Sequence, residues 1–229
     1  FATEIPLAAK TNPVAVDIFR LFLPSPPVPH VSIDFNLDFM PIIFEELAVL
    51  LAITYLLLAV RQDIRCWFAG ILSSLIYLYL MFSVNLYMES VLQIFYVGMG
   101  FYGWFKWNKS QQMSNNSNIV TWRPAKHLVV VFFIVLTGLM SGNLLREYTD
   151  AVLPNADSVT TIGALVATYM VAKKVLENWF YWFVIDAISV MLFIERELYL
   201  TALLFLIYLI IIIFGYRTWL KDYELQSKV

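Results

Sequence analysis

Residues 198–219 read LYLTALLFLIYLIIIIFGYRTW, a run of 22 residues that is almost wholly apolar until Arg217. A helix needs about 20 apolar residues to cross the hydrocarbon of a bilayer, so this stretch predicts a membrane-spanning helix. Residues 86–107 read LYMESVLQIFYVGMGFYGWFKW. Both stretches begin with Leu-Tyr and end with the pattern Gly-x-x-x-Trp. This likeness indicates an internal repeat.

The repeat extends backwards over a second helix. A shift of 112 residues aligns 67–107 with 179–219 without a gap and gives ten identities in 41 positions. Trp and Gly seldom match by chance, and internal repeats of this kind define the architecture of a chain. The pairs that carry the match are Trp67/Trp179, Phe68/Phe180, Ile76/Ile188, Leu80/Leu192, Leu86/Leu198, Tyr87/Tyr199, Leu92/Leu204, Tyr96/Tyr208, Gly103/Gly215 and Trp107/Trp219.

Seven segments have the length and apolar character of membrane spans: 42–60, 67–86, 88–107, 128–145, 158–176, 178–194 and 198–219. The repeat places the first three on the last three and leaves the fourth as a connector. The predicted fold is therefore an all-α integral membrane protein with seven transmembrane helices, arranged as two parallel three-helix repeats joined by a linker helix (3+1+3). Parallel repeats of this kind are typical of transporters with a central site between the halves.

The repeat also divides the chain. Prolines break every apolar run before residue 42, and Ser, Asn and Gln dominate 108–118, which is typical of a flexible aqueous linker. The expected parts are an extracytoplasmic or interfacial segment (1–41), the first three-helix repeat (42–107), a cytoplasmic linker (108–127), the connecting transmembrane helix (128–145), the second repeat (146–219) and a cytoplasmic tail (220–229).

Composition supports a lipid bilayer as the surroundings of the chain. The 229 residues are 61% hydrophobic and 14% charged, which is too little polar surface for a water-soluble domain. The net charge of −2 excludes a nucleic-acid partner, and the single cysteine, Cys66, excludes a disulfide and a cysteine-based metal site. No secretory signal pattern opens the sequence, so internal spans are expected to direct insertion.

The positive charges are asymmetric. Eleven of the fifteen Lys and Arg residues follow spans 1, 3, 5 and 7. By the positive-inside rule, this predicts an N-terminus outside and a C-terminus in the cytoplasm. Trp107 and Trp219 lie beside these charges, where interfacial aromatic belts form. We expect them, with Gly103 and Gly215 at close helix contacts, to serve as scaffold.

Function is expected where the repeat is broken. Asn178, Trp182 and Asp186 are spaced i, i+4, i+8 and therefore share one helix face. Their counterparts, Cys66, Gly70 and Ser74, carry different chemistry. A carboxylate near the middle of a span costs about 2.5–3.5 kcal/mol, so Asp186 should face a wet cavity or a partner rather than lipid. A buried structural pair is the alternative, although no Lys or Arg lies at comparable depth.

A second polar stripe contains Glu89, Gln93 and Tyr96 in the third span. The counterparts of the first two are Thr201 and Phe205, which cannot do the same chemistry. Gln93 can both donate and accept hydrogen bonds, which suits the recognition of hydroxyls or an amide. The alternative is that Gln93 and Asn178 are interhelical hydrogen-bonding residues.

The run from Glu177 to Asp186 (ENWFYWFVID), Tyr102-Gly103-Trp104 with Trp107, and the Gly215…Trp219 ending resemble the PnuC family of bacterial nicotinamide riboside transporters, over about 42–220. The resemblance implies a fold similar to a SWEET sugar transporter, located in the bacterial inner membrane. It also implies facilitated uptake of nicotinamide riboside, a vitamin B3 precursor, with trapping by cytoplasmic phosphorylation and no cofactor or metal.

The resemblance carries four binding positions over to this chain: Gln93, Asn178, Trp182 and Asp186. Three aromatic residues complete the candidate substrate-binding set: Tyr96, Trp179 and Tyr208. A flat Trp face suits a cationic pyridinium ring, and amides suit the carboxamide and ribose hydroxyls.

Other functions are less compatible with the residues. An enzyme is disfavoured because His30 and His127 lie outside the spans and no Gly-x-Ser-x-Gly or His-Glu-x-x-His pattern occurs. A proton-coupled transporter of another nucleoside-like or sugar-like molecule, using Asp186, remains an alternative. A structural or ion-channel role is a third, and a homo-oligomer is compatible with the sequence.

Overall fold

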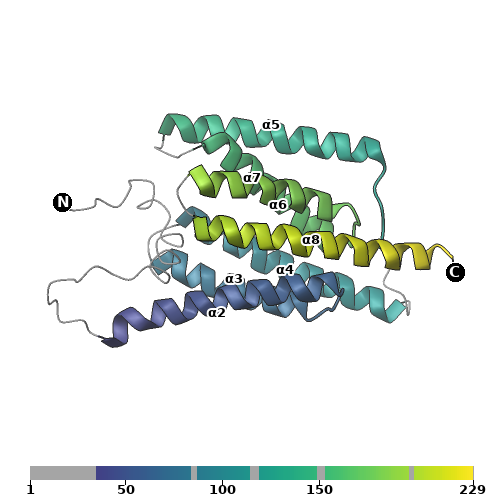
Figure 1. Ribbon diagram of the computed structural model, residues 1–229, viewed down its shortest axis with the longest axis horizontal. Helices are drawn as coiled ribbons and strands as arrows, with labels where there is room; N and C mark the ends of the chain where they lie inside the picture. Colours follow the sequence, from purple (N-terminus) through teal and green to yellow (C-terminus); the bar gives the residue numbers. More distant parts are fainter. Residues whose placement is uncertain (1–34, 84–86, 114–118, 149–152, 196–198, 229) are drawn as a thin grey trace.

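The computed structural model describes residues 35–83, 87–113, 119–148, 153–195 and 199–228, and seven α-helices make up most of them (Figure 1). The all-α fold expected from the sequence is confirmed. The helices are α2 (Phe35–Val60), α3 (Cys66–Ser83), α4 (Tyr87–Met113), α5 (Pro124–Tyr148), α6 (Pro154–Ala172), α7 (Asn178–Glu195) and α8 (Tyr199–Gln226).

The helix packing has the symmetry that the repeat predicts. In the first unit α3 packs against α2 and α4, and in the second unit α7 packs against α6 and α8. Between the units, α4 packs against α6 and α8 packs against α2. The third helix of each unit thus contacts the first helix of the other. The 3+1+3 arrangement is confirmed, with α5 packed on α6 as the connector.

The turns inside the two units also match. Gln62 follows α2 with φ 54° and Lys174 follows α6 with φ 52°, both in the left-handed region that few non-glycine residues adopt. The Gln62 N–H donates to Ala59 O at 3.0 Å, and the Lys174 N–H donates to Val171 O at 2.9 Å. The two units therefore have the same backbone conformation at these equivalent positions, although one residue is Gln and the other is Lys.

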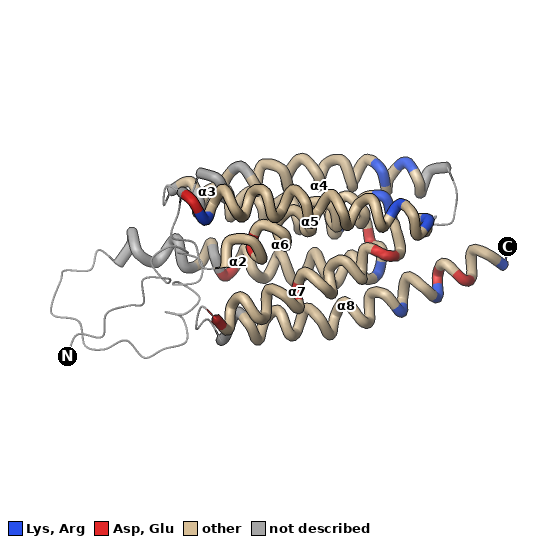
Figure 2. Tube along the Cα trace, turned by 90° about the horizontal axis from the view of Figure 1, so that it is seen from above, with Lys and Arg blue, Asp and Glu red and all other residues tan. Residues whose placement is uncertain are grey.

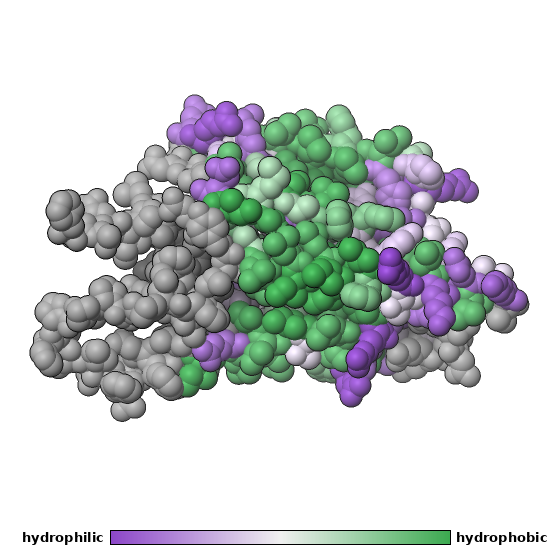
Figure 3. All heavy atoms as spheres, in the orientation of Figure 1, coloured by the Kyte–Doolittle hydropathy of each residue, from purple (hydrophilic) through white to green (hydrophobic). Residues whose placement is uncertain are grey.

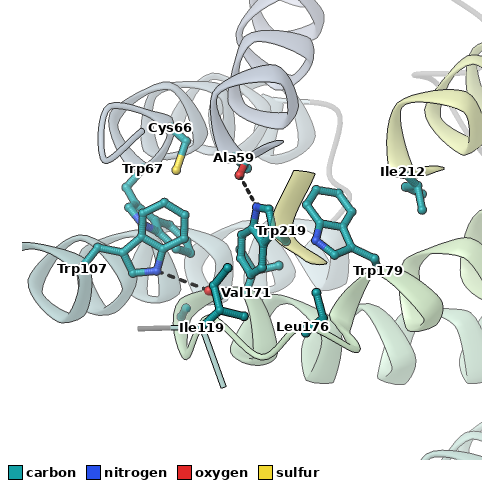
Figure 4. Packing of buried hydrophobic residues seen from close by; sticks show 11 residues of the cluster. Ala59, Cys66, Trp67, Trp107, Ile119, Val171, Leu176, Trp179, Ile212 and Trp219 are labelled. Atoms are coloured by element: carbon teal, nitrogen blue, oxygen red, sulfur yellow. Dashed lines mark hydrogen bonds between the residues drawn. The ribbon is translucent and has the colours of Figure 1, made fainter. Parts of the chain in front are cut away.

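Four tryptophans form the centre of the main buried cluster (Figure 4). Trp67 and Trp107 meet edge-to-face with ring centroids 5.3 Å apart, and Trp179 and Trp219 meet in the same way at 5.4 Å. Trp107 and Trp219 lie 6.2 Å apart. Each unit thus contributes one T-shaped pair, and the two pairs meet between the units.

Hydrogen bonds between the units accompany this packing. Trp107 Nε1 donates to Val171 O at 3.3 Å, and Trp219 Nε1 donates to Ala59 O at 3.1 Å (Figure 4). The two bonds are equivalent under the repeat. Trp107 is 1% exposed and Trp219 is 0% exposed. The expectation that they belong to an interfacial aromatic belt is wrong, because the indole N–H groups bond to the opposite unit rather than to headgroups.

Gly103 and Gly215 make room for these rings. A Cβ atom on Gly103 would overlap the Trp67 indole, and one on Gly215 would overlap the Trp179 indole. The close contact that was expected for the glycines is confirmed. Its partner is a tryptophan ring of the same unit.

The outer surface suits a bilayer. Apolar side chains cover the middle of the face shown in Figure 3. Figure 2 shows most of the charged residues near the two ends, with Lys and Arg gathered at the end that carries the C-terminus. Leu128, Phe132 and Met140 on α5 are 73%, 61% and 65% exposed. Among the described helices, α5, α7 and α8 are long and apolar enough to cross a membrane by length and composition.

Several boundaries differ from the expectation. The first helix begins at Phe35 rather than 42 and continues through Pro41, although proline lacks the N–H for an intrahelical bond. Residues 1–34 of the expected N-terminal segment lie outside the described residues. Of the expected linker, 108–113 are helical in α4, and α5 begins at Pro124, a residue well suited to the first turn of a helix.

The second unit shows two further differences. Residues 173–176, expected within a span, form the turn after α6, because the chain reverses there at Lys174. The expected tail at 220–229 is helical as far as Gln226. Leu220 and Tyr223 pack against the tryptophan cluster, and Gln226 Oε1 accepts a hydrogen bond from the Ile119 N–H at 2.9 Å. These contacts extend α8 beyond its apolar part.

Candidate functional site

The polar face of α7 points into the protein. Asn178 is 0% exposed and Asp186 is 5% exposed, and Trp182 is partly buried. On the opposite face, Phe180 and Val184 are 53% and 56% exposed. The spacing i, i+4, i+8 thus predicted the orientation of these three side chains correctly.

Asn178 has one structural bond and one free oxygen. Its Nδ2 donates to Val175 O at 2.7 Å, which fixes the side chain at the start of α7. Its buried Oδ1 has no hydrogen-bond partner within the part of the chain that the structure describes. An unpaired buried acceptor costs roughly 1–3 kcal/mol, so this oxygen is suited to accept a bond from a ligand or water.

Asp186 lies inside the second unit. No ion pair or hydrogen bond of its carboxyl group occurs within the described ranges. Tyr208 on α8 lies near this carboxyl group, so two of the candidate residues are neighbours. The structural pair with a basic side chain, considered as an alternative, is absent among these residues.

Trp182 lies between two groups of buried side chains. One is the tryptophan cluster, and the other consists of Ala164, Ala167 and Ile185. The Trp182 indole packs against these side chains and remains partly exposed. A partly covered, rigid ring at the interior of a unit is a good surface for stacking.

Trp179 is placed differently from Trp182. It is 2% exposed, and its ring meets Trp219 and Gly215. Almost none of its surface remains for a ligand. The structure therefore places this candidate in the frame.

Gln93 and Tyr96 lie on α4, in the first unit. Both are partly buried, whereas Ile94 is 57% exposed, so these two residues of the polar stripe face inward; the side chain of Glu89 lies outside the described part. Tyr96 lies near Tyr55 on α2. Within the described residues, no hydrogen bond or ring contact joins Gln93 or Tyr96 to the α7 stripe. Helix α6 packs against both α4 and α7 and is the neighbour that the two stripes share.

Sequence reasoning missed the polar contacts between the units. Gln62 Nε2 donates to Asp222 Oδ2 at 2.7 Å, and Lys174 Nζ donates to Gln62 Oε1 at 3.3 Å. Gln62 and Lys174 are 112 residues apart and hence equivalent in the repeat. The spacing of 112 residues could have indicated that the two positions are equivalent. The repeat did not reveal them because the two residue types differ and because neither left-handed turn contains the glycine that usually marks one.

A cavity of the described part of the protein lies away from the candidate residues. It has a volume of about 460 Å³ and is lined by α5, α6 and α7. None of the seven candidate residues lines it. Its walls are apolar apart from a few residues such as His127, Glu177 and Tyr181, so it offers little that would recognise a riboside.

Comparison with known proteins identifies the family. Residues 42–221 match the family described as nicotinamide mononucleotide transporters. The chain belongs to this family. The matched range contains all seven candidate residues, and the chain is accordingly a multi-pass membrane transporter rather than an enzyme.

Similar proteins carry related names. The nicotinamide riboside transporter PnuC of Escherichia coli is 23% identical over 190 residues, covering 72% of this chain and 80% of that protein. The PnuC of Neisseria mucosa is 25% identical over 189 residues, covering 76% and 72%. The riboflavin/roseoflavin transporter RibM of Streptomyces davaonensis is 23% identical over 176 residues, covering 74% and 81%.

The fold is also similar to a solved structure, the crystal structure of the vitamin B3 transporter PnuC. The TM-score is 0.63 at 19% identity, and the match covers 98% of this chain and 94% of the other. The resemblance to the PnuC family, first indicated by the tryptophan-rich run in α7, is confirmed.

Proposed function

We propose that this chain moves nicotinamide riboside across a membrane by facilitated diffusion with alternating access. The observation that carries the proposal is the inward face of α7, where the buried Asn178 Oδ1 and the buried Asp186 carboxyl group have no hydrogen-bond or ion-pair partner among the described residues, and the partly buried Trp182 lies between them. Polar groups left unpaired inside a membrane protein mark substrate pathways.

The chemistry of the substrate suits these groups. Nicotinamide riboside has a cationic pyridinium ring, a carboxamide and ribose hydroxyls. Trp182 offers a face for the ring, with cation–π attraction of about 0.5–2 kcal/mol. Asp186 supplies the opposite charge, and Asn178 Oδ1 accepts a hydrogen bond from an amide or hydroxyl. In the proposal Gln93 and Tyr96 contribute from the first unit, on α4, which packs against α6.

The similar proteins support a substrate made of a flat ring and a sugar-like chain. Two of them are named for nicotinamide riboside and one for riboflavin or roseoflavin. The carboxyl group of Asp186 favours the cationic ring of nicotinamide riboside over the neutral ring of riboflavin, because a buried charge without a partner is costly.

The charge distribution supports an orientation. Lys and Arg gather at the end that carries the C-terminus (Figure 2), so this end faces the cytoplasm and the N-terminus lies outside. In the proposal the protein lies in the bacterial inner membrane, with lipid around its apolar belt, and cytoplasmic phosphorylation traps the substrate. A homo-oligomer is compatible with the apolar outer face of α5.

Alternating access requires the cytoplasmic end to open and close. In the present conformation the tryptophan cluster and the Trp107–Val171 and Trp219–Ala59 bonds join the units at that end. The proposed inward-open state separates the units there, and each bond has a symmetry mate that must break with it.

Calorimetric binding to the purified full-length protein in detergent tests the proposal. We expect saturable binding of nicotinamide riboside and at least tenfold weaker binding of riboflavin and of a neutral nucleoside such as uridine. Equal or tighter binding of riboflavin would reassign the substrate, and no binding of any of the three would refute the proposal.

A further inference from the structure

A second cavity, of about 430 Å³, lies at the proposed cytoplasmic end. Its walls come from the end of α4, the segment before α5, the start of α5, the end of α6 and the turn that follows. No Asp or Glu is among its lining residues, but five lysines are: Lys106, Lys109, Lys126, Lys173 and Lys174.

The positive-inside rule alone does not account for this cavity. It predicts Lys and Arg on the cytoplasmic face, but not their convergence on one hollow. Lys221 and Lys228 lie at the same end on or after α8 and are exposed, and neither lines the cavity. These two lysines are therefore the ordinary solvated lysines of this end of the protein, with which the lysines of the cavity can be compared.

Aromatic rings, rather than carboxylates, hold three of the five ammonium groups. Lys126 Nζ lies 3.5 Å from the centroid of the Trp122 ring, and Lys174 Nζ lies 4.5 Å from that of Trp107. Lys173 Nζ lies 5.6 Å from the centroids of both Tyr102 and Tyr169. A cation–π contact positions a cation without cancelling its formal charge.

The positive charge of the cavity is therefore only partly compensated: the carboxylate of Asp222, which accepts a hydrogen bond from Gln62, acts on Lys174 from outside the cavity lining. Within the described residues, no ion pair joins any of the five lysines to a carboxylate. Like charges brought together in a concave site repel each other and attract an anion, and low-dielectric walls strengthen both effects. The aromatic faces add a surface on which a ring could lie.

Lys174 is the innermost of the five. It is 3% exposed, and its ammonium group has three donors, of which one bonds to Gln62 Oε1 at 3.3 Å. Asp222 acts on Lys174 electrostatically, but among the described residues no carboxylate forms an ion pair with it, and a buried lysine in that position is suited to bind an anion directly.

The walls of the cavity are held in place. The Val120 N–H donates to Lys174 O at 3.0 Å, and the Leu176 N–H donates to Val120 O at 2.9 Å. Two residues further on, the Trp122 N–H donates to the Glu177 carboxylate at 3.3 Å. These bonds fix the segment before α5 against the turn after α6. A site that is ordered before binding loses less entropy when a ligand arrives.

We propose that this cavity binds the phosphate group of an anionic ligand on the cytoplasmic side of the transporter. Two sources share that chemistry: a soluble phosphorylated compound and the headgroup of an anionic phospholipid. Because α4 belongs to the first unit and the turn after α6 to the second, a bound phosphate bridges the units beside the Trp107–Val171 bond. A phosphate group bound in this cavity therefore stabilises the closed conformation of the cytoplasmic end, whichever substrate the central site binds.

Binding to the purified full-length protein in a phosphate-free neutral detergent at low salt tests the proposal. One arm titrates inorganic pyrophosphate by calorimetry. The other adds dioctanoyl phosphatidylglycerol, with dioctanoyl phosphatidylcholine as the uncharged comparison, and follows thermal unfolding. Saturable pyrophosphate binding identifies a soluble ligand as the source, and stabilisation by the anionic lipid alone identifies a headgroup.

Two double variants with the same charge change decide whether the cavity is responsible. Lys109→Gln/Lys126→Gln removes two exposed lysines that line it, and Lys221→Gln/Lys228→Gln removes two exposed lysines that do not. We expect affinity for the binding probe to fall at least tenfold in the first variant and less than twofold in the second. Equal losses in both variants, or no saturable effect of either probe on the unaltered protein, would overturn the proposal.

Discussion

Replacing Gly215 by alanine should destabilise the protein, because the added methyl group has no room. Its Cβ would lie well inside the roughly 3.5–4.0 Å of ordinary carbon contact with the Trp179 ring. The ring cannot move away freely, since its edge-to-face contact with Trp219 places the centroids 5.4 Å apart. Overpacking of this kind costs about 1–3 kcal/mol. In a chain of this size that corresponds to a midpoint lower by roughly 2–12 °C.

The repeat makes this prediction sharper. Gly103→Ala should lower the midpoint by a similar amount, because its Cβ would meet the Trp67 ring in the equivalent position. Gly98→Ala on α4 is the matched control, since apart from the adjoining helix backbone no atom lies within 4 Å of the position that its Cβ would take. Alanine is the better helix former, so this control should keep or raise the midpoint.

Thermal unfolding of the three variants in one detergent, followed by circular dichroism at the helical band, gives the comparison. If Gly215→Ala unfolds at the temperature of Gly98→Ala, the tight packing of glycine against tryptophan is not what joins the helices of each unit. If only one of Gly103→Ala and Gly215→Ala is destabilised, the two units are not equivalent at their centre.

Four further predictions follow from the site and the frame. Trp182→Ala should weaken nicotinamide riboside binding more than tenfold in calorimetry, because the ring face is lost, whereas Phe180→Ala, on the outward face of α7, should leave affinity within twofold. Asp186→Asn should weaken the same binding but keep or raise the unfolding midpoint, because no described partner loses an ion pair; a large fall in midpoint would show a structural role. Trp219→Phe removes the bond to Ala59 O and shrinks a fully buried ring, so it should cost at least about 1–3 kcal/mol, measured as a lower midpoint; an unchanged midpoint would show that neither the bond nor the ring packing stabilises the protein. Burial lowers the pKa of Lys174 from its ordinary value of 10.5 to about 8, because the charged form is penalised in the folded state alone. Lys174→Met should therefore stabilise the protein most below pH 8, and the gain should shrink as the pH rises toward 10.5. Thermal unfolding of both proteins across about pH 7–10.5 measures this difference, and a difference that stayed constant would contradict the prediction.

The frame was largely predictable because the repeat places rare residues at fixed spacing. The pairs Trp107/Trp219 and Gly103/Gly215 predicted equivalent positions, and the structure places both pairs in equivalent contacts. Their environment was not predictable. A tryptophan beside lysine and arginine at the end of a span is typical of a membrane interface, and nothing local indicates that its N–H bonds to the opposite unit.

The turn after each first helix could not be predicted from local sequence. A left-handed residue is usually glycine or asparagine, but here Gln62 and Lys174 take that conformation. The helical extension of α8 to Gln226 was missed for a related reason, since contacts with distant parts of the chain stabilise a polar helix end that hydropathy assigns to a tail.

The site was predicted in part. Helical spacing alone placed Asn178, Trp182 and Asp186 on one face, and that face is turned inward as expected. Trp179 shows the limit of residue type as a guide. It has the same side chain as Trp182, so residue type alone suggested a binding role for both. Its match with Trp67 in the repeat predicted a structural role instead, and Trp179 does pack inside the tryptophan cluster.

Uptake of labelled nicotinamide riboside into proteoliposomes that contain only this protein tests the central claim most directly. Facilitated diffusion through the α7 site predicts saturable uptake that stops when the internal concentration equals the external one, with or without an imposed pH gradient, and loss of that uptake in Trp182→Ala. Accumulation above the external concentration when the gradient is imposed, or undiminished uptake by the Trp182 variant, would contradict the account.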